Sequence, residues 1–284
     1  GGPVLFSPDG RTLALVDSPR GQLWDVATRR PRTTLPSRFV NAMAFSPDGK
    51  TLVTVGDGLV LWDARSGRPR VELPKAEVGS PLAFSPTGDV FATTGGRNWA
   101  IRLRDPATGR VRSTLTEPEA GVPPRGAKGD LPMFFRQVQS MAFSPDGHTL
   151  ASADSDGTVR LWNTDTGHLD ATLTVSLTEG PVELAFSPDG RTLATAAGSA
   201  VRLWDTATRY ARATFPGGGG SPLAFSPDGR TLAVGDHRDR LSLWDADLPL
   251  PAEAVTGICR AVHRDLTRQE RALYLPDGEP GRVC

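Results

Sequence analysis

The fold of this chain follows from residues 40–63, which read VNAMAFSPDGKTLVTVGDGLVLWD. Ala42–Phe45 and Thr51–Val55 are short apolar runs that predict β-strands. Between them lies Ser46-Pro47-Asp48-Gly49, in which proline fixes φ and glycine accepts a positive φ, so a tight turn is expected. A second turn leads into a third strand at Leu59–Trp62. With a fourth strand near Pro69–Leu73, about 40 residues form one small antiparallel sheet.

This unit recurs along the chain. Phe-Ser-Pro begins at Phe6, Phe45, Phe84, Phe143, Phe186 and Phe225, with successive offsets of 39, 39, 59, 43 and 39. About 18 residues after each Phe, a second element ends in Leu23-Trp24-Asp25, Leu61-Trp62-Asp63, Leu103-Arg104-Asp105, Leu161-Trp162-Asn163, Leu203-Trp204-Asp205 and Leu243-Trp244-Asp245. Strands such as Val159–Trp162 are apolar on both sides, and a lone sheet of four strands could not bury both faces. The units are therefore expected to stack.

These residues resemble the WD40 repeat family, over roughly Pro3 to Asp247. The resemblance implies an all-β fold, a β-propeller of four-stranded blades, with six repeats in residues 1–248 and an insert at about 116–137. Two features depart from the family. Its Gly-His dipeptide is absent, so the buried hydrogen-bond network of the family is expected to be incomplete, and Arg104 replaces Trp in the third unit.

Residues 249–284 are expected to form a short α-helical tail. Ala252–Asp265 can be helical, and Thr267-x-x-Glu270 is a capping-box signal for a second helix. The tail resembles the one that follows WD40 propellers in actinobacterial signalling proteins, whose parents often carry a STAND-type NTPase or another effector domain. The resemblance therefore implies that the chain is the C-terminal propeller of a larger protein.

The sequence leaves two ways in which the propeller could close. After Trp244-Asp245 no clear fourth strand follows. Either further blades precede Gly1 in the parent, or the segment near Pro251 to Val255 completes the ring irregularly.

Composition excludes several classes of function. The chain of 284 residues has 32 Lys+Arg and 32 Asp+Glu, whereas nucleic-acid binders normally have a basic excess. No apolar run approaches the length of a membrane span, so neither a nucleic-acid nor a membrane partner is expected. Two cysteines, Cys259 and Cys284, are too few for a disulfide framework, which favours a reducing, cytoplasmic location. They are interpreted as a buried thiol and a tail residue, with pairing or metal binding as the alternative.

The recurring aspartates could be metal ligands, but their position in the repeat is better explained by a role in turns. Asp9, Asp48, Asp146, Asp189 and Asp228 each lie in a Ser-Pro-Asp-Gly hairpin of a different unit, so they are interpreted as turn residues. Asp154-Ser155-Asp156-Gly157 is the nearest approach to a calcium loop and lacks the further ligands. We expect no metal and no cofactor.

Aromatic and Arg-bearing loops are the candidate partner-binding elements. By the family's topology, the insert shares a face with the turns that follow each second strand, and partners commonly dock on that face. The candidates are Arg38, Phe39, Arg97, Trp99, Phe134, Phe135, His237 and Arg238. Local packing is the alternative for Trp99 and the Phe134-Phe135 pair. The repeated Trp24, Trp62, Trp162, Trp204 and Trp244 are interpreted as blade-packing residues.

The sequence thus favours a non-catalytic protein-interaction or sensing scaffold whose partner is a protein or peptide. No phosphate loop, zinc-protease or serine-hydrolase motif is present, so we expect no enzyme. The alternative is a propeller hydrolase or lyase acting at the central channel, which predicts a histidine and paired carboxylates there. A third hypothesis is a structural role against an attached NTPase.

Overall fold

The structure is a computed structural model that describes residues 4–17, 20–35, 40–74, 79–95, 100–115, 137–155, 157–175, 182–198, 200–216, 222–235 and 240–247. The chain divides into two compact units, Gly1–Trp244 and Asp245–Cys284. The expected helical tail, with Cys259 and Cys284, lies outside the described residues. In the described part, no helix is long and apolar enough to cross a bilayer.

The described residues form strands joined by turns, grouped in six antiparallel sheets. The first two sheets comprise β1 (Val4–Phe6), β2 (Thr12–Asp17), β3 (Arg20–Asp25), β4 (Arg30–Leu35), β5 (Val40–Phe45), β6 (Thr51–Gly56), β7 (Gly58–Asp63) and β8 (Pro69–Pro74). The third and fourth comprise β9 (Gly79–Phe84), β10 (Phe91–Gly95), β11 (Ala100–Arg104), β12 (Val111–Leu115), β13 (Val138–Phe143), β14 (Thr149–Asp154), β15 (Thr158–Asn163) and β16 (Leu169–Thr174). The last two comprise β17 (Glu183–Phe186), β18 (Thr192–Ala197), β19 (Ala200–Asp205), β20 (Ala211–Pro216), β21 (Leu223–Phe225), β22 (Thr231–Gly235) and β23 (Leu241–Asp245).

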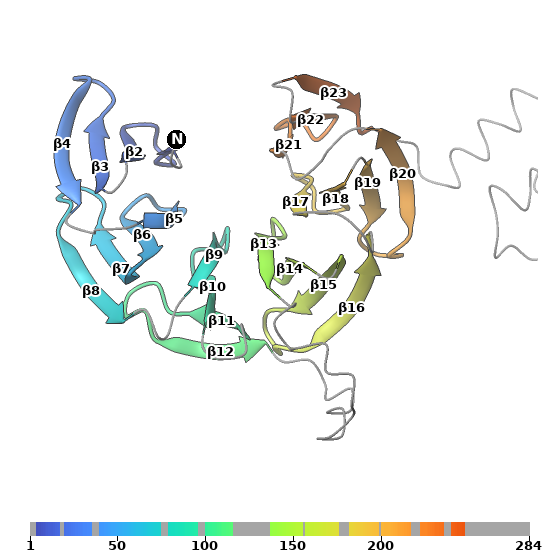
Figure 1. Ribbon diagram of the computed structural model, residues 1–284, viewed down its shortest axis with the longest axis horizontal. Coiled ribbons are helices and arrows are strands. Elements are labelled where there is room, and N and C mark those ends of the chain that lie inside the picture. The colour runs from blue at the N-terminus through green and yellow to red at the C-terminus, as the bar shows by residue number, and fades with distance from the viewer. Residues whose placement is uncertain are drawn as a thin grey trace, which may run out of the picture. The chain divides into compact units, whose positions relative to one another are not determined.

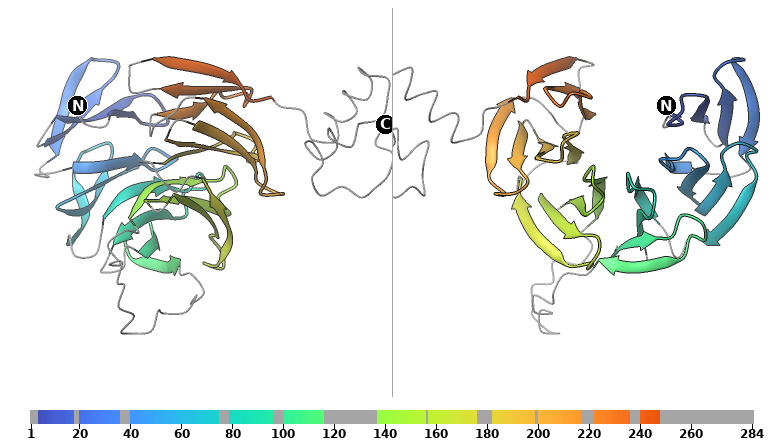
Figure 2. Two further views of the ribbon diagram at one scale, coloured as in Figure 1. Left: turned by 45° about the vertical axis from the view of Figure 1, so that its right-hand side comes forward. Right: turned by 180° about the vertical axis from the view of Figure 1, so that it is seen from behind.

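Each sheet is a meander in which every strand pairs with the next along the chain, as the repeat predicted. In the described residues the sixth sheet has three strands, β21-β22-β23, and the others have four. Figure 1 shows the sheets following one another in chain order, with the first strand of each innermost, and the view from behind in Figure 2 shows the same succession. The four-stranded unit predicted from residues 40–73 is confirmed.

The Ser-Pro-Asp-Gly turns are held by their own side chains. Ser46 Oγ donates to Asp48 Oδ1 at 2.6 Å and accepts the Thr51 amide at 3.0 Å. Asp48 Oδ1 also accepts the Lys50 amide at 3.0 Å, and Gly49 has a φ of +68°. The Ser46 hydroxyl holds the pKa of Asp48 below its ordinary value. The same contacts recur around Asp9, Asp146, Asp189 and Asp228, which confirms their interpretation as turn residues.

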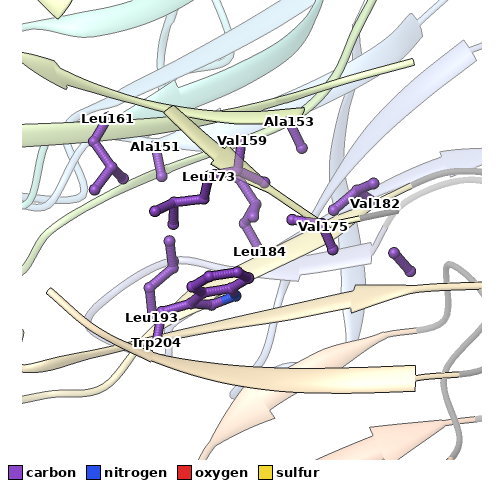
Figure 3. Packing of buried hydrophobic residues seen from close by; sticks show 11 residues of the cluster. Ala151, Ala153, Val159, Leu161, Leu173, Val175, Val182, Leu184, Leu193 and Trp204 are labelled. Atoms are coloured by element: carbon purple, nitrogen blue, oxygen red, sulfur yellow. The ribbon is translucent and has the colours of Figure 1, made fainter. Parts of the chain in front are cut away.

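Successive sheets stack face to face. We call the face toward the next sheet along the chain the leading face and the one toward the preceding sheet the trailing face. Figure 3 shows Val159, Leu161 and Leu173 from the leading face of the fourth sheet against Leu193 and Trp204 from the trailing face of the fifth. Equivalent clusters join the first sheet to the second, the second to the third and the third to the fourth. Burial of both faces explains why the strands are apolar on both sides.

Three of the blade-packing tryptophans, Trp62, Trp162 and Trp204, make the same buried hydrogen bond. Nε1 of Trp62 donates to Thr54 Oγ1 at 2.9 Å. Trp162 donates in the same way to Ser152 at 2.9 Å, and Trp204 to Thr195 at 3.0 Å. The network lacks the family's histidine, as expected, but this link between the second and third strands is kept.

Arg104 takes the place of Trp in the third sheet and reproduces this bond. It is buried, and its Nε donates to Thr93 Oγ1 at 3.0 Å. Its Nη1 donates to the Gly109 carbonyl at 2.9 Å, which satisfies a second polar group inside the sheet. The substitution that looked like a departure in sequence is therefore equivalent in its hydrogen bonding.

Candidate interaction face

The two ends of the sheets differ in chemistry. One end, the turn face, has the turns between the first and second strands and between the third and fourth strands of each sheet. These turns are aligned between sheets: a Cβ added to Gly49 would lie 3.6 Å from Pro8 Cδ of the preceding sheet, and one on Gly190 would lie 3.4 Å from Pro145 Cδ. The other end, the loop face, has the connections between second and third strands and those between sheets, because neighbouring strands alternate in direction.

On the turn face, the aspartate at the end of a third strand accepts hydrogen bonds from residues of the turn that follows it. Asp63 Oδ1 accepts the amide and the hydroxyl of Ser66, at 2.8 and 2.9 Å. These bonds, with Arg70, lower the pKa of Asp63 to about 2, the Ser66 amide being the largest cause. The pKa of Asp25 is about 2 for the same reason, with the Thr28 amide first, and that of Asp105 is about 2, with Arg112 first.

An arginine seven residues later completes each of these turns. Arg32 Nη2 lies 2.7 Å from Asp25 Oδ2, and Arg112 Nε donates to Asp105 Oδ2 at 3.1 Å. Arg70 pairs with Asp63 in the same way. Sequence reasoning missed these pairs, although the spacing Asp-x6-Arg is visible at all three places. The polar groups of the turn face are thus largely engaged within the turns.

On the loop face, the described residues include one corner that is held by backbone and side-chain hydrogen bonds. Gln137, which follows the insert, donates its amide to Ser155 Oγ at 3.1 Å, and the Ser155 amide donates to the Gln137 carbonyl at 3.0 Å. The turn that contains Ser155 begins at Asp154, whose carboxylate forms a buried ion pair with Arg160. The end of the insert is therefore fixed to the β14–β15 turn. Sequence reasoning assigned the Asp154 turn no function, and the ion pair shows that Asp154 links this turn to Arg160 of β15.

All eight candidate partner-binding residues fall outside the described residues, so they stay predictions. The segments that contain them, 36–39, 96–99, 116–136 and 236–239, leave described strands at the loop face. The structure confirms the strand topology on which the prediction of a shared face relied.

The inner strands test the catalytic alternative. In the described parts of β1, β5, β9, β13, β17 and β21, Glu183 is the sole ionisable side chain. Ser140 Oγ approaches Glu183 Oε2 at 3.5 Å, and partial burial raises the pKa of Glu183. The described inner strands contain neither a histidine nor a second carboxylate, which are the groups the catalytic alternative expects there.

The described histidines belong to the turn face. His148 Nδ1 lies 2.9 Å from Asp165 Oδ2, and both side chains are exposed. His168 precedes β16. Among the described residues, no three His, Cys, Asp or Glu side chains are grouped so that they could hold a metal ion.

Comparison with known proteins gives the repeat its family context. The WD40 family model (WD domain, G-beta repeat) matches residues 29–63, 134–163 and 167–205. Each match runs from an outer strand or a sheet connection to the third strand of a sheet. The unit with Arg104 in place of Trp lies between the first two matches.

Solved and curated relatives agree with this match. The β-propeller domain of Cps50 (Swd1) from Myceliophteria thermophila superposes with a TM-score of 0.65 over 86% of this chain and 81% of that chain, at 19% identity. WD repeat-containing protein VIP3 of Arabidopsis thaliana is 33% identical over 107 residues, covering 38% of this chain and 32% of VIP3. Small ribosomal subunit protein RACK1y of Oryza sativa is 27% identical over 169 residues, covering 56% of this chain and 46% of RACK1y. The chain spans less than half the length of these curated relatives.

The predicted fold class is confirmed: the chain has an all-β fold, a β-propeller of WD40-type blades.

Proposed function

We propose that this propeller is a non-catalytic scaffold that recognises a protein or peptide partner through its loop face. The contrast between the two faces supports the proposal. On the turn face, near-identical turns bind their own carboxylates, hydroxyls and amides, so little polar surface is left to distinguish one partner from another. On the loop face, the connections differ in length and sequence, and the longest of them returns at Gln137, fixed to Ser155. Variable segments on a rigid scaffold are a common basis of recognition.

We further propose that the propeller is the C-terminal part of a larger bacterial signalling protein in the cytoplasm. The resemblance of residues 249–284 to tails of actinobacterial proteins supports this, and an attached NTPase or other effector domain is the intramolecular partner that it implies. The equal numbers of acidic and basic residues argue against nucleic acid as the partner.

A capture experiment tests the loop-face proposal. The chain, and a variant with Trp99→Ala, Phe134→Ala and Phe135→Ala, are immobilised and exposed to a lysate of the source cells. Tyr210→Ala, which removes an exposed aromatic side chain from the turn face, is the matched control. We expect the triple variant to lose a specific protein that the control retains, at unchanged melting temperature. Recovery of the same proteins by all three chains would show that the assignment of these residues is wrong.

A further inference from the structure

Basic charge is concentrated in the outer turns of the first three sheets. These turns, from the end of the third strand into the fourth, are residues 25–32, 63–70 and 105–112. Together they contain eight arginines and three aspartates, although the whole chain has equal numbers of basic and acidic residues. The equivalent turn of the fourth sheet, residues 163–170, contains two aspartates and no arginine. One sector of the turn face is therefore strongly basic.

The aspartates of these turns offset only part of this charge. Each of them pairs with the arginine seven residues later, which is Arg32, Arg70 or Arg112. The other five arginines are exposed, and none of them forms an ion pair in the part of the chain that the structure describes. They are Arg29, Arg30, Arg65, Arg68 and Arg110. The turn carboxylates are thus engaged, whereas these guanidinium groups can bind an external anion.

Three of the unpaired arginines occupy the same position of the repeat. In the second and third sheets, the amide of the turn aspartate donates to the carbonyl of the arginine five residues later, Arg68 or Arg110, at 2.9 Å. Arg30 has the equivalent place in the first sheet, where it pairs with Asp25 in the register of β3 and β4. We call Arg30, Arg68 and Arg110 the outer arginine row.

The turns that contain the row lie against one another from sheet to sheet. Nη1 of Arg32 donates to the Arg65 carbonyl at 3.4 Å, which joins the outer strand of the first sheet to the turn of the second. A Cβ added to Gly109, in the third turn, would lie 3.2 Å from Leu73 Cδ1 of β8. Figure 1 shows β4, β8 and β12 following one another as the outermost strands of consecutive sheets. The row is therefore continuous over three sheets.

We infer that the outer arginine row binds an acidic, extended segment of a protein partner. Carboxylates already pair with arginines in these turns, because Arg32, Arg70 and Arg112 each contact an aspartate. Stacked sheets lie about 10 Å apart, so three arginines on consecutive sheets span at least about 20 Å. About six or more residues of extended chain cover this length, with an aspartate or glutamate opposite each arginine.

Other polyanions fit the row less well. Proteins bind single-stranded nucleic acid by stacking bases on aromatic side chains, and the three turns contain no aromatic residue. Their exposed large apolar side chains are Val26 and Val111. A flat anionic membrane lying on the turn face would also meet the exposed Asp165 and Asp170 of the fourth sheet. A narrow, carboxylate-bearing ligand can follow the row without reaching them.

The outer arginine row and the loop face lie at opposite ends of the sheets. A ligand on the row therefore leaves the loop face free for a different partner. The inference does not rest on the proposed function.

Fluorescence anisotropy with an acidic peptide tests the inference. The probe is a fluorescein-labelled peptide of about ten residues in which glutamate alternates with serine, titrated at about 50 mM salt so that screening is weak. The parent chain is compared with a row variant that has Arg30→Gln, Arg68→Gln and Arg110→Gln. We expect the row variant to bind the probe at least about fivefold more weakly, because it lacks three exposed arginine–carboxylate contacts.

A control variant removes the same charge from the inner turns of the same face. It has Arg11→Gln, Lys50→Gln and Arg191→Gln, at exposed positions that each follow the glycine of a turn between first and second strands. We expect its affinity for the probe to stay within about twofold of the parent's, and both variants to keep the parent's melting temperature, because only exposed side chains change.

Three results would overturn the inference. The first is equal affinity of the probe for the parent chain and the row variant. The second is a loss in the control variant as large as that in the row variant, which would show that net charge alone attracts the peptide. The third is binding of an oligothymidylate or of phosphatidylserine vesicles that depends on the row while the acidic peptide does not bind. That result would identify a phosphate-bearing ligand instead.

Discussion

Trp62, Trp162 and Trp204 each donate a buried hydrogen bond to a Ser or Thr of the neighbouring strand, and Arg104 does the same in the third sheet. Side chains as different as indole and guanidinium occupy one position because each places an N–H where the hydroxyl needs it. A buried polar group without a partner costs about 1–3 kcal/mol, so the hydroxyl and the donor depend on each other.

Replacement of Arg104 separates its hydrogen bonding from its charge. Arg104→Leu leaves the Thr93 hydroxyl and the Gly109 carbonyl without this donor, and we expect it to lower the free energy of unfolding by about 2–3 kcal/mol. Arg104→Trp supplies an indole N–H to Thr93 and should cost less than about 1 kcal/mol. Urea denaturation measures both. Equal losses in the two variants would contradict this account of the position.

The sixth sheet lacks the acceptor for its tryptophan. Trp244 Nε1 is buried and has no partner in the part of the chain that the structure describes. The repeat places Val234 where Thr54 and Thr195 stand in other sheets, since Val234 pairs with Leu223 as Thr54 pairs with Met43. We expect Val234→Thr to raise the free energy of unfolding by about 1 kcal/mol. Val53→Thr is the control. It places a hydroxyl at a buried site of the second sheet where no indole N–H can donate to it, so it should lower the free energy of unfolding.

At the scale of single elements, the turns define the sheets. The repeat predicted every Ser-Pro-Asp-Gly turn from its own residues, because proline, glycine and a hydroxyl-carboxylate pair specify that geometry locally. It did not predict the pairs such as Asp25 with Arg32, because these join the end of a third strand to the outer strand. The hydrogen bond of Arg104 was missed for a similar reason, since its partner Thr93 lies eleven residues away on another strand.

Acid should weaken the turns at the ends of the third strands. The folded pKa of Asp63 is about 2, below its ordinary value of 3.8. The stabilisation from its ionised form is therefore complete above about pH 4 and is lost as the pH falls toward 2. In urea denaturation between pH 5 and 2, Asp63→Asn should flatten this loss of stability. Asp57→Asn, which removes a carboxylate from an exposed turn of the same sheet, controls for the change in net charge.

Two glycines with the same backbone conformation make a matched pair. Gly67 has a φ of +66°, and a Cβ on it would lie 2.2 Å from Thr33 Cγ2 of the preceding sheet. Gly10 has a φ of +69° and nothing within 4 Å of such an atom. We expect Gly10→Ala to cost about 1 kcal/mol from backbone strain alone, and Gly67→Ala about 3 kcal/mol because Thr33 must also move. Equal thermal shifts would show that the turn does not pack against the preceding sheet.

At the scale of the molecule, sequence reasoning identified the repeat, the number of visible units and the propeller, because each unit repeats the same local pattern. The candidate partner-binding residues remain predictions, since they lie in connections whose sequences differ from unit to unit and have no periodicity to interpret. The exposure of β23 was also not predictable residue by residue. Leu241 and Leu243 read like every other third strand, and only the stacking shows that no sheet among the described residues covers them.

The central claim, that a protein partner is recognised on the loop face, is tested most directly by photo-crosslinking from both faces. A photoreactive amino acid replaces Asp57, Gln137 or Ser155 on the loop face, or Thr28, Ser66 or Tyr210 on the turn face, and each chain is irradiated in source-cell lysate. The account predicts that one and the same protein is crosslinked from the loop-face positions and not from the turn-face positions. Crosslinking of that protein chiefly from Thr28, Ser66 and Tyr210 would contradict it.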